Sequence, residues 1–322
     1  MIKNNSHTGP ALIADIGGTN ARFAVARDGE IAGNVTVLAC QDHNNLAAAA
    51  NTFLNSLNPA DRPKYGIIAV AAPVTEGTVQ LTNLNWQFSK DQLCEDLKLD
   101  GLDIVNDFTA IAWAVPRLQA CDRRQVGGGT PRTDAPIVVI GPGTGLGVSA
   151  LVPALDGWVV LPTEGGHVTM AGSTVMEDKV LDVLRHKFGH VSAERVLSGP
   201  GLVNIYEALV KLENQSPKPI GPQQVSANAL ADPASHEALA LRMFFDFLGT
   251  AASNAALSLD AHGGVYVAGG VVGNLGDAFA ASGFRRRFEA KGRFESYVAD
   301  IPTFAITHPF AALAGLAAGP LV

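Results

Sequence analysis

The sequence predicts an α/β protein of about two domains. Its 322 residues are 47% hydrophobic, which is enough for a large core at the usual ~100 to 200 residues per domain. Short apolar runs alternate with longer stretches of helical periodicity, and this alternation is typical of α/β proteins. In addition, each half of the chain opens with a hairpin rich in glycine and threonine.

The predicted strands are short apolar runs bounded by turn residues. They lie at Ala11–Ala14, Phe23–Ala26, Gly66–Ala71, Leu102–Val105, Ile137–Ile140, Trp158–Leu161, Val265–Ala268 and Phe304–Thr307. The predicted helices carry apolar residues at three- and four-residue steps, which gives each helix one buried face. They lie at Leu46–Leu57, Glu177–Phe188, Val203–Leu212 and His236–Leu259.

Two polar segments that contain proline, Arg123–Pro136 and Glu213–Pro222, are predicted to be loops. The strand and hairpin pattern restarts just after the first of them. We therefore expect a domain boundary near this loop.

Composition disfavours several classes of protein. The cysteines, Cys40, Cys94 and Cys121, have none of the paired spacings of zinc sites or disulfide frameworks. A net charge of -7 disfavours nucleic acid as a partner, and the longest basic run is only Arg285–Arg287. No apolar run approaches the ~18 to 20 residues of a membrane helix, and residues 1–10 are too short and polar for a signal peptide. We expect a cytoplasmic protein with no membrane partner.

The two hairpins are candidate phosphate-binding loops. The first is Asp15-Ile16-Gly17-Gly18-Thr19-Asn20, and the second runs from Gly141 to Gly147. Glycines permit positive φ and close approach, so that successive N–H groups can converge on phosphate oxygens. No lysine follows a glycine, which excludes a Walker A motif, and Leu146 stands where a Rossmann fingerprint needs glycine. Simple tight turns are the alternative, and a duplicated architecture or shared turn chemistry would each explain the likeness of the hairpins.

Asp15 leads the first hairpin. An acidic residue beside a phosphate nest is electrostatically unfavourable unless a cation lies between them. Asp15 is therefore predicted to hold Mg²⁺, through water, as this ion prefers.

Several motifs together resemble the bacterial glucokinase family, in order and over nearly the whole chain. They are Asp15 to Arg22, Asn106-Asp107-Phe108, Gly141 to Gly147, Glu164-Gly165-Gly166-His167, His190 to Arg195 and Ser198-Gly199-Pro200-Gly201. The resemblance implies an actin-like (ribonuclease H-like) two-domain sugar-kinase fold with a duplicated core, and ATP and glucose as substrates. The related ROK kinases usually carry a zinc-binding cysteine cluster, and no cysteine follows Cys121 here.

The resemblance also implies the domain bounds and the nucleotide site. Residues 1–116 with 305–322 would form a small domain and residues 117–304 a large one, with the active-site cleft between them. Phe310–Ala318 resembles the helix that returns to the first domain. The predicted nucleotide-binding residues are Ala14, Asp15, Ile16, Gly17, Gly18, Thr19, Gly143, Thr144, Gly145, Gly269 and Gly270. For the last two, a simple turn is the alternative.

Asn106 and Asp107 follow a predicted strand, where reactive groups of α/β sheets usually lie. Asp107 is the candidate general base, accepting the proton of the sugar C6 hydroxyl as that oxygen attacks the γ-phosphate. Asn106 is a predicted sugar ligand. The alternative is that Asn-Asp only makes a turn and caps a helix starting near Thr109.

Glu164, His167 and Glu194 are the remaining predicted sugar ligands. The glycines between Glu164 and His167 let a carboxylate and an imidazole converge on the hydroxyls of one small ligand. A metal site is the rival, but this pair supplies only half of one. For Glu194, the alternative is favourable contact with the dipole of a helix capped by Ser192.

The predicted reaction is transfer of the γ-phosphate of Mg-ATP to the C6 hydroxyl of glucose. The alternatives are a kinase of another hexose, such as fructose, mannose or an N-acetylhexosamine, and a non-enzymatic sugar-responsive repressor. The acidic charge and the absence of room for an N-terminal helix-turn-helix disfavour the repressor. A homodimer is expected from the resemblance alone.

Overall fold

The computed structural model describes residues 9–72, 78–81, 86–155 and 157–319. The chain divides into two compact units: unit 1 is Met1–Gln119 with His308–Val322, and unit 2 is Ala120–Thr307. Residues 1–8, part of the segment expected to carry no signal peptide, lie outside the described residues. None of the described helices has both the length and the apolar character needed to cross a membrane.

Unit 1 contains a five-stranded sheet in the order β3-β2-β1-β4-β7, as far as its residues are described. β1 pairs antiparallel with β2 and parallel with β4, and β4 pairs parallel with β7. The elements of this unit are β1 (Ala11–Ile16), β2 (Asn20–Arg27), β3 (Glu30–Ala39), α1 (Leu46–Ser56), β4 (Tyr65–Val70), β5 (Thr78–Gln80), β6 (Gln87–Ser89), α2 (Lys90–Asp96), β7 (Gly101–Asn106), α3 (Asp107–Ala114) and α12 (Ala311–Ala318).

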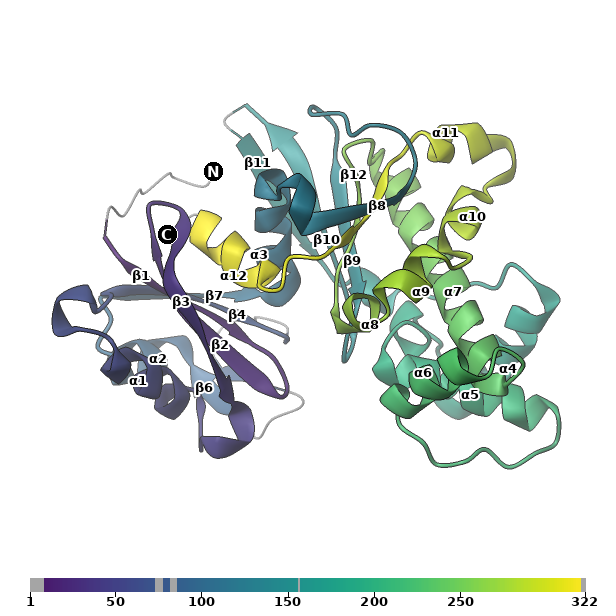
Figure 1. The fold of residues 1–322 in the computed structure, drawn as a ribbon, viewed down its shortest axis with the longest axis horizontal. Coiled ribbons are helices and arrows are strands. Elements are labelled where there is room, and N and C mark those ends of the chain that lie inside the picture. Colours follow the sequence, from purple (N-terminus) through teal and green to yellow (C-terminus); the bar gives the residue numbers. More distant parts are fainter. Residues whose placement is uncertain (1–8, 73–77, 82–85, 156, 320–322) are drawn as a thin grey trace. The chain divides into compact units, whose positions relative to one another are not determined.

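Helices cover both faces of this sheet. In β1, Leu12 belongs to the apolar cluster that includes α1 and α2, whereas the next residue, Ile13, belongs to the cluster that includes α3 and α12. Side chains of a strand alternate between its faces, so a strand apolar on both faces is one buried on both sides. α12 packs against α3 (Figure 1). A Cβ at Gly315 of α12 would overlap the carbonyl oxygen of Ala110, so glycine allows the close contact of these helices.

Unit 2 contains a six-stranded sheet in the order β11-β10-β9-β12-β13-β8 within the described residues, together with a group of helices (Figure 1). Its elements are β8 (Arg123–Gly127), β9 (Ile137–Pro142), β10 (Leu146–Ala154), β11 (Gly157–Thr163), α4 (Val175–Phe188), α5 (Gly199–Leu212), α6 (Pro222–Ala231), α7 (His236–Leu259), β12 (Gly264–Val267), α8 (Gly270–Asn274), α9 (Gly276–Ala280), α10 (Phe284–Glu289), α11 (Glu295–Ala299) and β13 (Thr303–Ile306).

The two sheets repeat one topology. β11-β10-β9 is an antiparallel meander, followed by β12 and β13 in parallel. β3-β2-β1, followed by β4 and β7, has the same order and the same strand directions. This repeat confirms the predicted α/β class and duplicated core.

The prediction that Arg123–Pro136 is a loop throughout was wrong, because its first residues form β8. This strand pairs antiparallel with β13 at the edge of the sheet. The guanidinium of Arg123 lies 4.9 Å from the ring centroid of Phe304 and donates a 2.6 Å hydrogen bond to the hydroxyl of Tyr266. A polar sequence can form a strand at this position because its charged groups have partners: the Arg123 guanidinium lies over the ring of Phe304, and Arg124 pairs with Asp277 at 2.7 Å.

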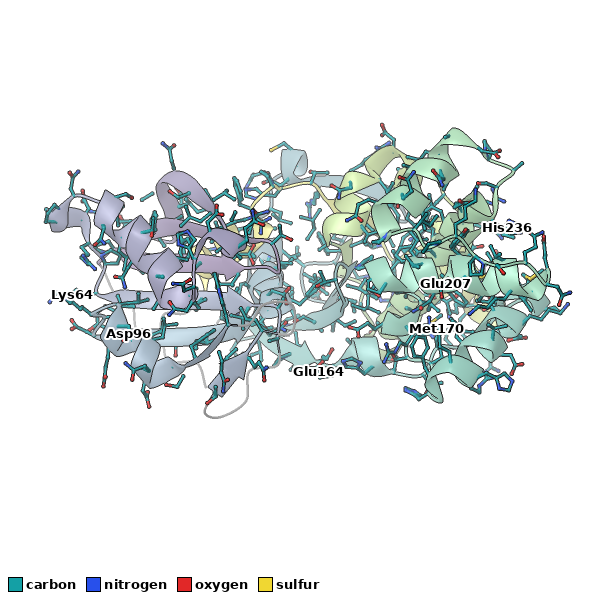
Figure 2. The ribbon with its side chains drawn as sticks, turned by 90° about the horizontal axis from the view of Figure 1, so that it is seen from below. Lys64, Asp96, Glu164, Met170, Glu207 and His236 are labelled. Carbon is teal, nitrogen blue, oxygen red and sulfur yellow. The ribbon has the colours of Figure 1, made fainter. Side chains whose placement is uncertain are left out.

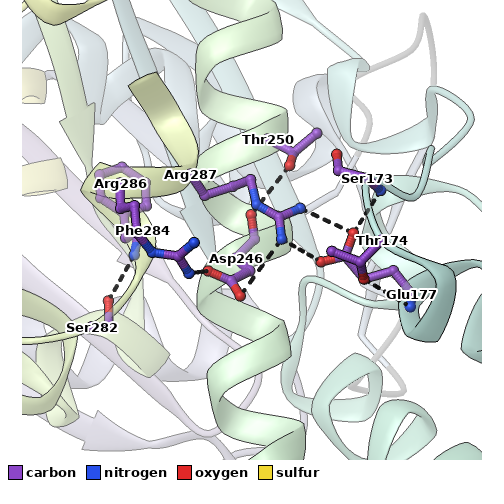
Figure 3. Close-up of polar contacts among 9 residues, drawn as sticks. All are labelled: Ser173, Thr174, Glu177, Asp246, Thr250, Ser282, Phe284, Arg286 and Arg287. Atoms are coloured by element: carbon purple, nitrogen blue, oxygen red, sulfur yellow. Dashed lines mark hydrogen bonds and ion pairs between the residues drawn. The ribbon is translucent and has the colours of Figure 1, made fainter. Parts of the chain in front are cut away.

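A buried ion pair joins three helices of unit 2 (Figure 3). Arg287 on α10 donates two hydrogen bonds, of 2.7 and 3.0 Å, to the carboxylate of Glu177 on α4. Asp246 on α7 lies 3.7 Å from the same guanidinium. Glu177 also accepts the N–H of Ser173 at 2.6 Å. The pair therefore fixes the start of α4 and the loop before it.

Candidate active site

Asp15, Asn106 and Asp107 emerge from one edge of the sheet in unit 1. β1, β4 and β7 run parallel, and Ile16, Val70 and Asn106 lie in register across them. The carboxyl ends of parallel strands meet at a single edge, which is the usual place for ligands in α/β proteins.

Asn106 and Asp107 also begin helix α3. Asn106 is the N-cap residue, and its side chain accepts the N–H of Phe108 at 2.9 Å. The Asp107 carboxylate accepts the same N–H at 3.0 Å. The helix begins at Asp107, slightly earlier than the expected start near Thr109. Capping and a catalytic role are compatible, because Asp107 keeps a second carboxylate oxygen beyond the one that accepts this N–H.

The pKa of the Asp107 carboxyl is raised towards neutral pH. Burial and, secondly, the negative charge of Asp15 raise its pKa from 3.8 to about 7, against the opposing effect of the Phe108 N–H. A base with a pKa near the working pH combines a large ionised fraction with a useful proton affinity. Asp107 is therefore the candidate general base of this site.

Asp15 faces Arg22 across the antiparallel pair β1–β2. The guanidinium of Arg22 lies 3.1 Å from the Asp15 carboxylate. Burial raises the pKa of Asp15, and Arg22 opposes that rise. The turn that follows Asp15 is held by a bond from the N–H of Gly17 to the carbonyl of Asn20 and by one from the N–H of Cys40 to the carbonyl of Thr19.

The second hairpin, Gly143–Gly145, joins β9 to β10 in unit 2. The N–H of Gly143 donates to the carbonyl of Gly145, and the carbonyl of Gly143 accepts the N–H of Gly199, each at 2.8 Å. Gly199 is the first residue of α5, which Ser198 caps. A Cβ at Gly269, whose φ is +92°, would overlap the carbonyl of Pro142. The hairpin therefore lies against the start of α5 and the Gly269–Gly270 turn.

The glycines of the hairpins are not required for positive φ. Gly17, Gly18, Gly143 and Gly145 do not adopt left-handed backbone, contrary to the argument from the sequence, whereas Gly269 does. A Cβ on Gly143 would meet nothing within 4 Å. A ligand could approach the backbone closely there.

Glu194 lies against this second hairpin. Its carboxylate accepts the N–H of Leu146 at 3.0 Å. Ser192 does not cap a helix, because residues Ala193–Arg195 form only a short 3-10 turn without a side-chain capping bond. The alternative explanation of Glu194 by a helix dipole is therefore wrong.

Glu164 and His167 lie on an exposed 3-10 turn, with side chains 67% and 60% exposed and 3.8 Å apart. Figure 2 shows Glu164 at the surface of unit 2, whereas Met170 lies buried among the helices. The segment after His167 pairs with the segment before Glu194, since Ala193 donates its N–H to the carbonyl of Val168 at 2.8 Å. The structure thus brings His167 and Glu194 into one region.

The predicted residues therefore form two groups, one in each unit. Unit 1 holds Ala14 to Thr19 with Asn106 and Asp107, and unit 2 holds Gly143 to Gly145, Glu164, His167, Glu194, Gly269 and Gly270. Leu146 and Gly166 were not predicted. A Cβ at Gly166 would overlap the carbonyl of Leu146, which places the Glu164–His167 turn directly against the hairpin.

Comparison with known proteins identifies the family. A family model described as Glucokinase matches residues 12–319. The chain belongs to the glucokinase family. This confirms the predicted family and its enzyme class, an ATP-dependent hexose kinase. A glucokinase from Paramagnetospirillum magneticum is 48% identical over 310 residues, which cover 95% of this chain and 96% of the relative.

Solved glucokinase structures share the fold. A crystal structure of glucokinase from an Antarctic psychrotroph is 34% identical, with a TM-score of 0.84, over 96% of this chain and 98% of that one. A ROK family glucokinase from Streptomyces griseus, in complex with glucose and AMPPNP, is 20% identical with a TM-score of 0.63, over 96% of this chain and 98% of that one, and shares the fold alone. The predicted actin-like sugar-kinase fold is confirmed.

Proposed function

We propose that the chain transfers the γ-phosphoryl group of ATP to the C6 hydroxyl of glucose, giving glucose 6-phosphate and ADP. Membership of the glucokinase family supports the activity. The observation that carries the mechanism is Asp107, a carboxylate at the end of a parallel strand with a pKa raised to about 7.

In the proposed step, Asp107 accepts the proton of the C6 hydroxyl as that oxygen bonds to the γ-phosphorus and the bond to the ADP oxygen breaks. Asn106 holds the sugar beside it. Such a base contributes roughly 10² to 10⁴ in rate.

The two hairpins bind the phosphates in this proposal. Gly17 and Gly143 donate their N–H groups within the turns, so the proposed donors to the phosphates are the N–H groups of Gly18, Thr19, Thr144 and Gly145. Donors aimed at the charge that develops on the transferred group are the type of stabilisation that usually contributes most. Ala14 and Ile16 form the strand that holds the first hairpin. Gly269 lies against Pro142, just before the second hairpin, and this contact supports the proposal that Gly269 and Gly270 approach the adenosine.

Mg²⁺ is proposed to bind at Asp15. A single carboxylate suits this ion, which keeps several waters and completes its coordination with phosphate oxygens. The described residues contain no group of three or more acidic, histidine or cysteine side chains that would form a protein-only metal cage. When bound, Mg²⁺ would supply positive charge against the phosphates.

Glu164, His167 and Glu194 are the proposed ligands of the other sugar hydroxyls. Carboxylates accept hydrogen bonds from hydroxyls, and a neutral imidazole donates or accepts. Glu164 and His167 are largely exposed, so a ligand can reach both side chains from solvent.

The test is an ADP-release assay on purified protein with Mg-ATP and a panel of glucose, fructose, mannose and N-acetylglucosamine. The proposal expects glucose to give the highest kcat/KM. A higher kcat/KM for another hexose would refute the substrate assignment while leaving the kinase chemistry in place. ADP release without any sugar phosphate would refute both.

We also propose a cytoplasmic homodimer that binds neither nucleic acid nor membrane. These properties come from the family resemblance and from the net charge of -7. Sedimentation at micromolar concentration measures the assembly, and a single species of monomer mass would contradict the dimer.

A further inference from the structure

Glu194 is attached to the phosphate hairpin by its carboxylate. The Oε2 atom accepts the N–H of Leu146, the residue that follows Gly145, at 3.0 Å. A carboxylate can accept hydrogen bonds on both oxygens. Glu194 can therefore hold the hairpin with one oxygen and a hydroxyl of a ligand with the other.

The hairpin has a glycine where it meets this carboxylate. A Cβ built on Gly145 would lie 2.5 Å from Oε2 of Glu194 and 3.3 Å from its Cδ. Heavy atoms do not approach so closely without displacement, so any larger residue at 145 would push the carboxylate away. Gly145 does not have left-handed backbone, so the requirement for glycine comes from Glu194 and not from φ.

The backbone of Glu194 is fixed to the other side of the hairpin. Its carbonyl accepts the hydroxyl of Ser198 at 2.8 Å. The adjacent Gly199 donates its N–H to the carbonyl of Gly143 at 2.8 Å. Both ends of the Gly143–Gly145 loop are thus bonded to the short segment Glu194–Gly199, so a movement of Glu194 is transmitted to the loop.

We propose that Glu194 is a positioning residue for the phosphate hairpin, and that it links occupancy of the sugar site to nucleotide affinity. The link rests on the proposed function, in which Glu194 contacts the sugar and the hairpin contacts the phosphates. A sugar hydroxyl on the free oxygen fixes the carboxylate, and the carboxylate fixes the N–H groups of the loop. Such a link is reciprocal, so bound nucleotide also raises the affinity for sugar.

A double-mutant cycle tests this link with Gly145→Ala, Glu194→Ala and the double variant. Titration calorimetry would measure the Kd of glucose and the Kd of a non-hydrolysable ATP analogue, each with and without the other ligand. Gly145→Ala alone should weaken glucose binding, although residue 145 belongs to the nucleotide half, by roughly 5- to 150-fold, the usual range of coupling. With Glu194→Ala present, the added methyl no longer meets a carboxylate, and Gly145→Ala should change the Kd of glucose by no more than about twofold.

Two further variants sharpen the cycle. Glu194→Gln keeps an oxygen that can accept the Leu146 N–H, so it should retain the analogue affinity that Glu194→Ala loses. Glu194→Gln can also be compared with the wild type if the alanine variants fail to fold. Gly143→Ala is the matched hairpin control, because its Cβ would meet nothing within 4 Å. The fold-changes in Kd caused by Gly143→Ala and by Glu194→Ala should therefore multiply when the two substitutions are combined.

Urea unfolding of the same proteins without ligand separates this inference from the proposed function. A protein that does not phosphorylate glucose would refute the proposed function. If the unfolding free energies of its variants are still non-additive, Glu194 remains the anchor of the hairpin. The inference would be overturned if the enzyme is active and the effects of Gly145→Ala and Glu194→Ala on both Kd values simply multiply. Loss of analogue affinity in Glu194→Gln equal to that in Glu194→Ala would also overturn it.

Discussion

Asp107→Asn changes one oxygen of the proposed general base to nitrogen and leaves the size of the side chain unchanged. The remaining oxygen can still accept the N–H of Phe108, which Asp107 accepts at 3.0 Å, so helix α3 should stay intact. Asparagine cannot take up the proton of the sugar hydroxyl. We expect kcat to fall by roughly 10² to 10⁴-fold.

The same substitution should stabilise the ligand-free protein at neutral and alkaline pH. The pKa of Asp107 is raised from 3.8 to about 7, so the folded state binds this proton more tightly than the unfolded chain does. The stability that this bound proton contributes to the folded state is fully present below pH ~4 and is lost as the pH rises through about 7. The whole shift corresponds to at most about 4 kcal/mol. Asparagine carries no charge and does not lose this stability.

Two assays check the prediction for Asp107→Asn. Steady-state ADP release measures kcat, and thermal unfolding from pH 5 to 9 measures stability. The Tm of the variant should exceed that of the wild type at pH 8, by roughly 2 to 4 °C for each kcal/mol. The difference should shrink as the pH is lowered. For the wild-type enzyme, kcat/KM should rise with pH and level off above about 7, because the base acts when ionised.

Asp103→Asn, on the strand β7 that leads to Asp107, is a matched control, because Asp103 forms an ion pair with Lys90 at 2.7 Å and has no proposed catalytic role. It should leave kcat unchanged and should not raise Tm. Near-normal kcat in Asp107→Asn would remove this residue from the base role. A variant less stable than the wild type at pH 8 would contradict the raised pKa.

Three further substitutions test other parts of the site and the fold. His167→Ala should raise the KM for glucose at least tenfold, an order-of-magnitude expectation for a lost polar contact, without changing Tm, because the side chain is 60% exposed; an unchanged KM would exclude it as a sugar ligand. Gly269→Ala should raise the KM for ATP and lower Tm, since its φ is +92° and a Cβ would overlap Pro142; normal values of both would contradict the close packing. Arg287→Met leaves Glu177 buried without its partner and should cost about 3 to 5 kcal/mol of unfolding free energy, as urea denaturation would measure; a loss below ~1 kcal/mol would show that the pair is not needed.

Buried strands could be predicted from the sequence, whereas the edge strands β3 and β8 were missed. β4 is buried along almost its whole length, and its apolar run was found. β3 and β8 lie at sheet edges, contain no fully buried residue and were not predicted. Their pairing is decided by the neighbouring strand, which an apolar-run criterion does not see.

The types of residues in the candidate site could be predicted, but their mutual contacts could not. The order of motifs identified Asp107 and Glu194. The bond between Glu194 and Leu146 spans 48 residues, and no local pattern encodes it. The positive φ expected for the hairpin glycines was also wrong. At Gly145 the fold uses the missing side chain instead, because the Glu194 carboxylate lies where a Cβ would be.

The seating of α12 against α3 has a consequence for how the protein is made. Unit 2 is continuous in sequence, whereas unit 1 requires residues 308–319, which leave the ribosome after all of unit 2 has been synthesised. Until α12 arrives, the face of α3 that contains Ala110 has no cover, although α3 begins with Asp107. A nascent chain can therefore synthesise the whole of unit 2, with its Gly143–Gly145 hairpin, before α12 is available to cover α3, the helix that begins with Asp107.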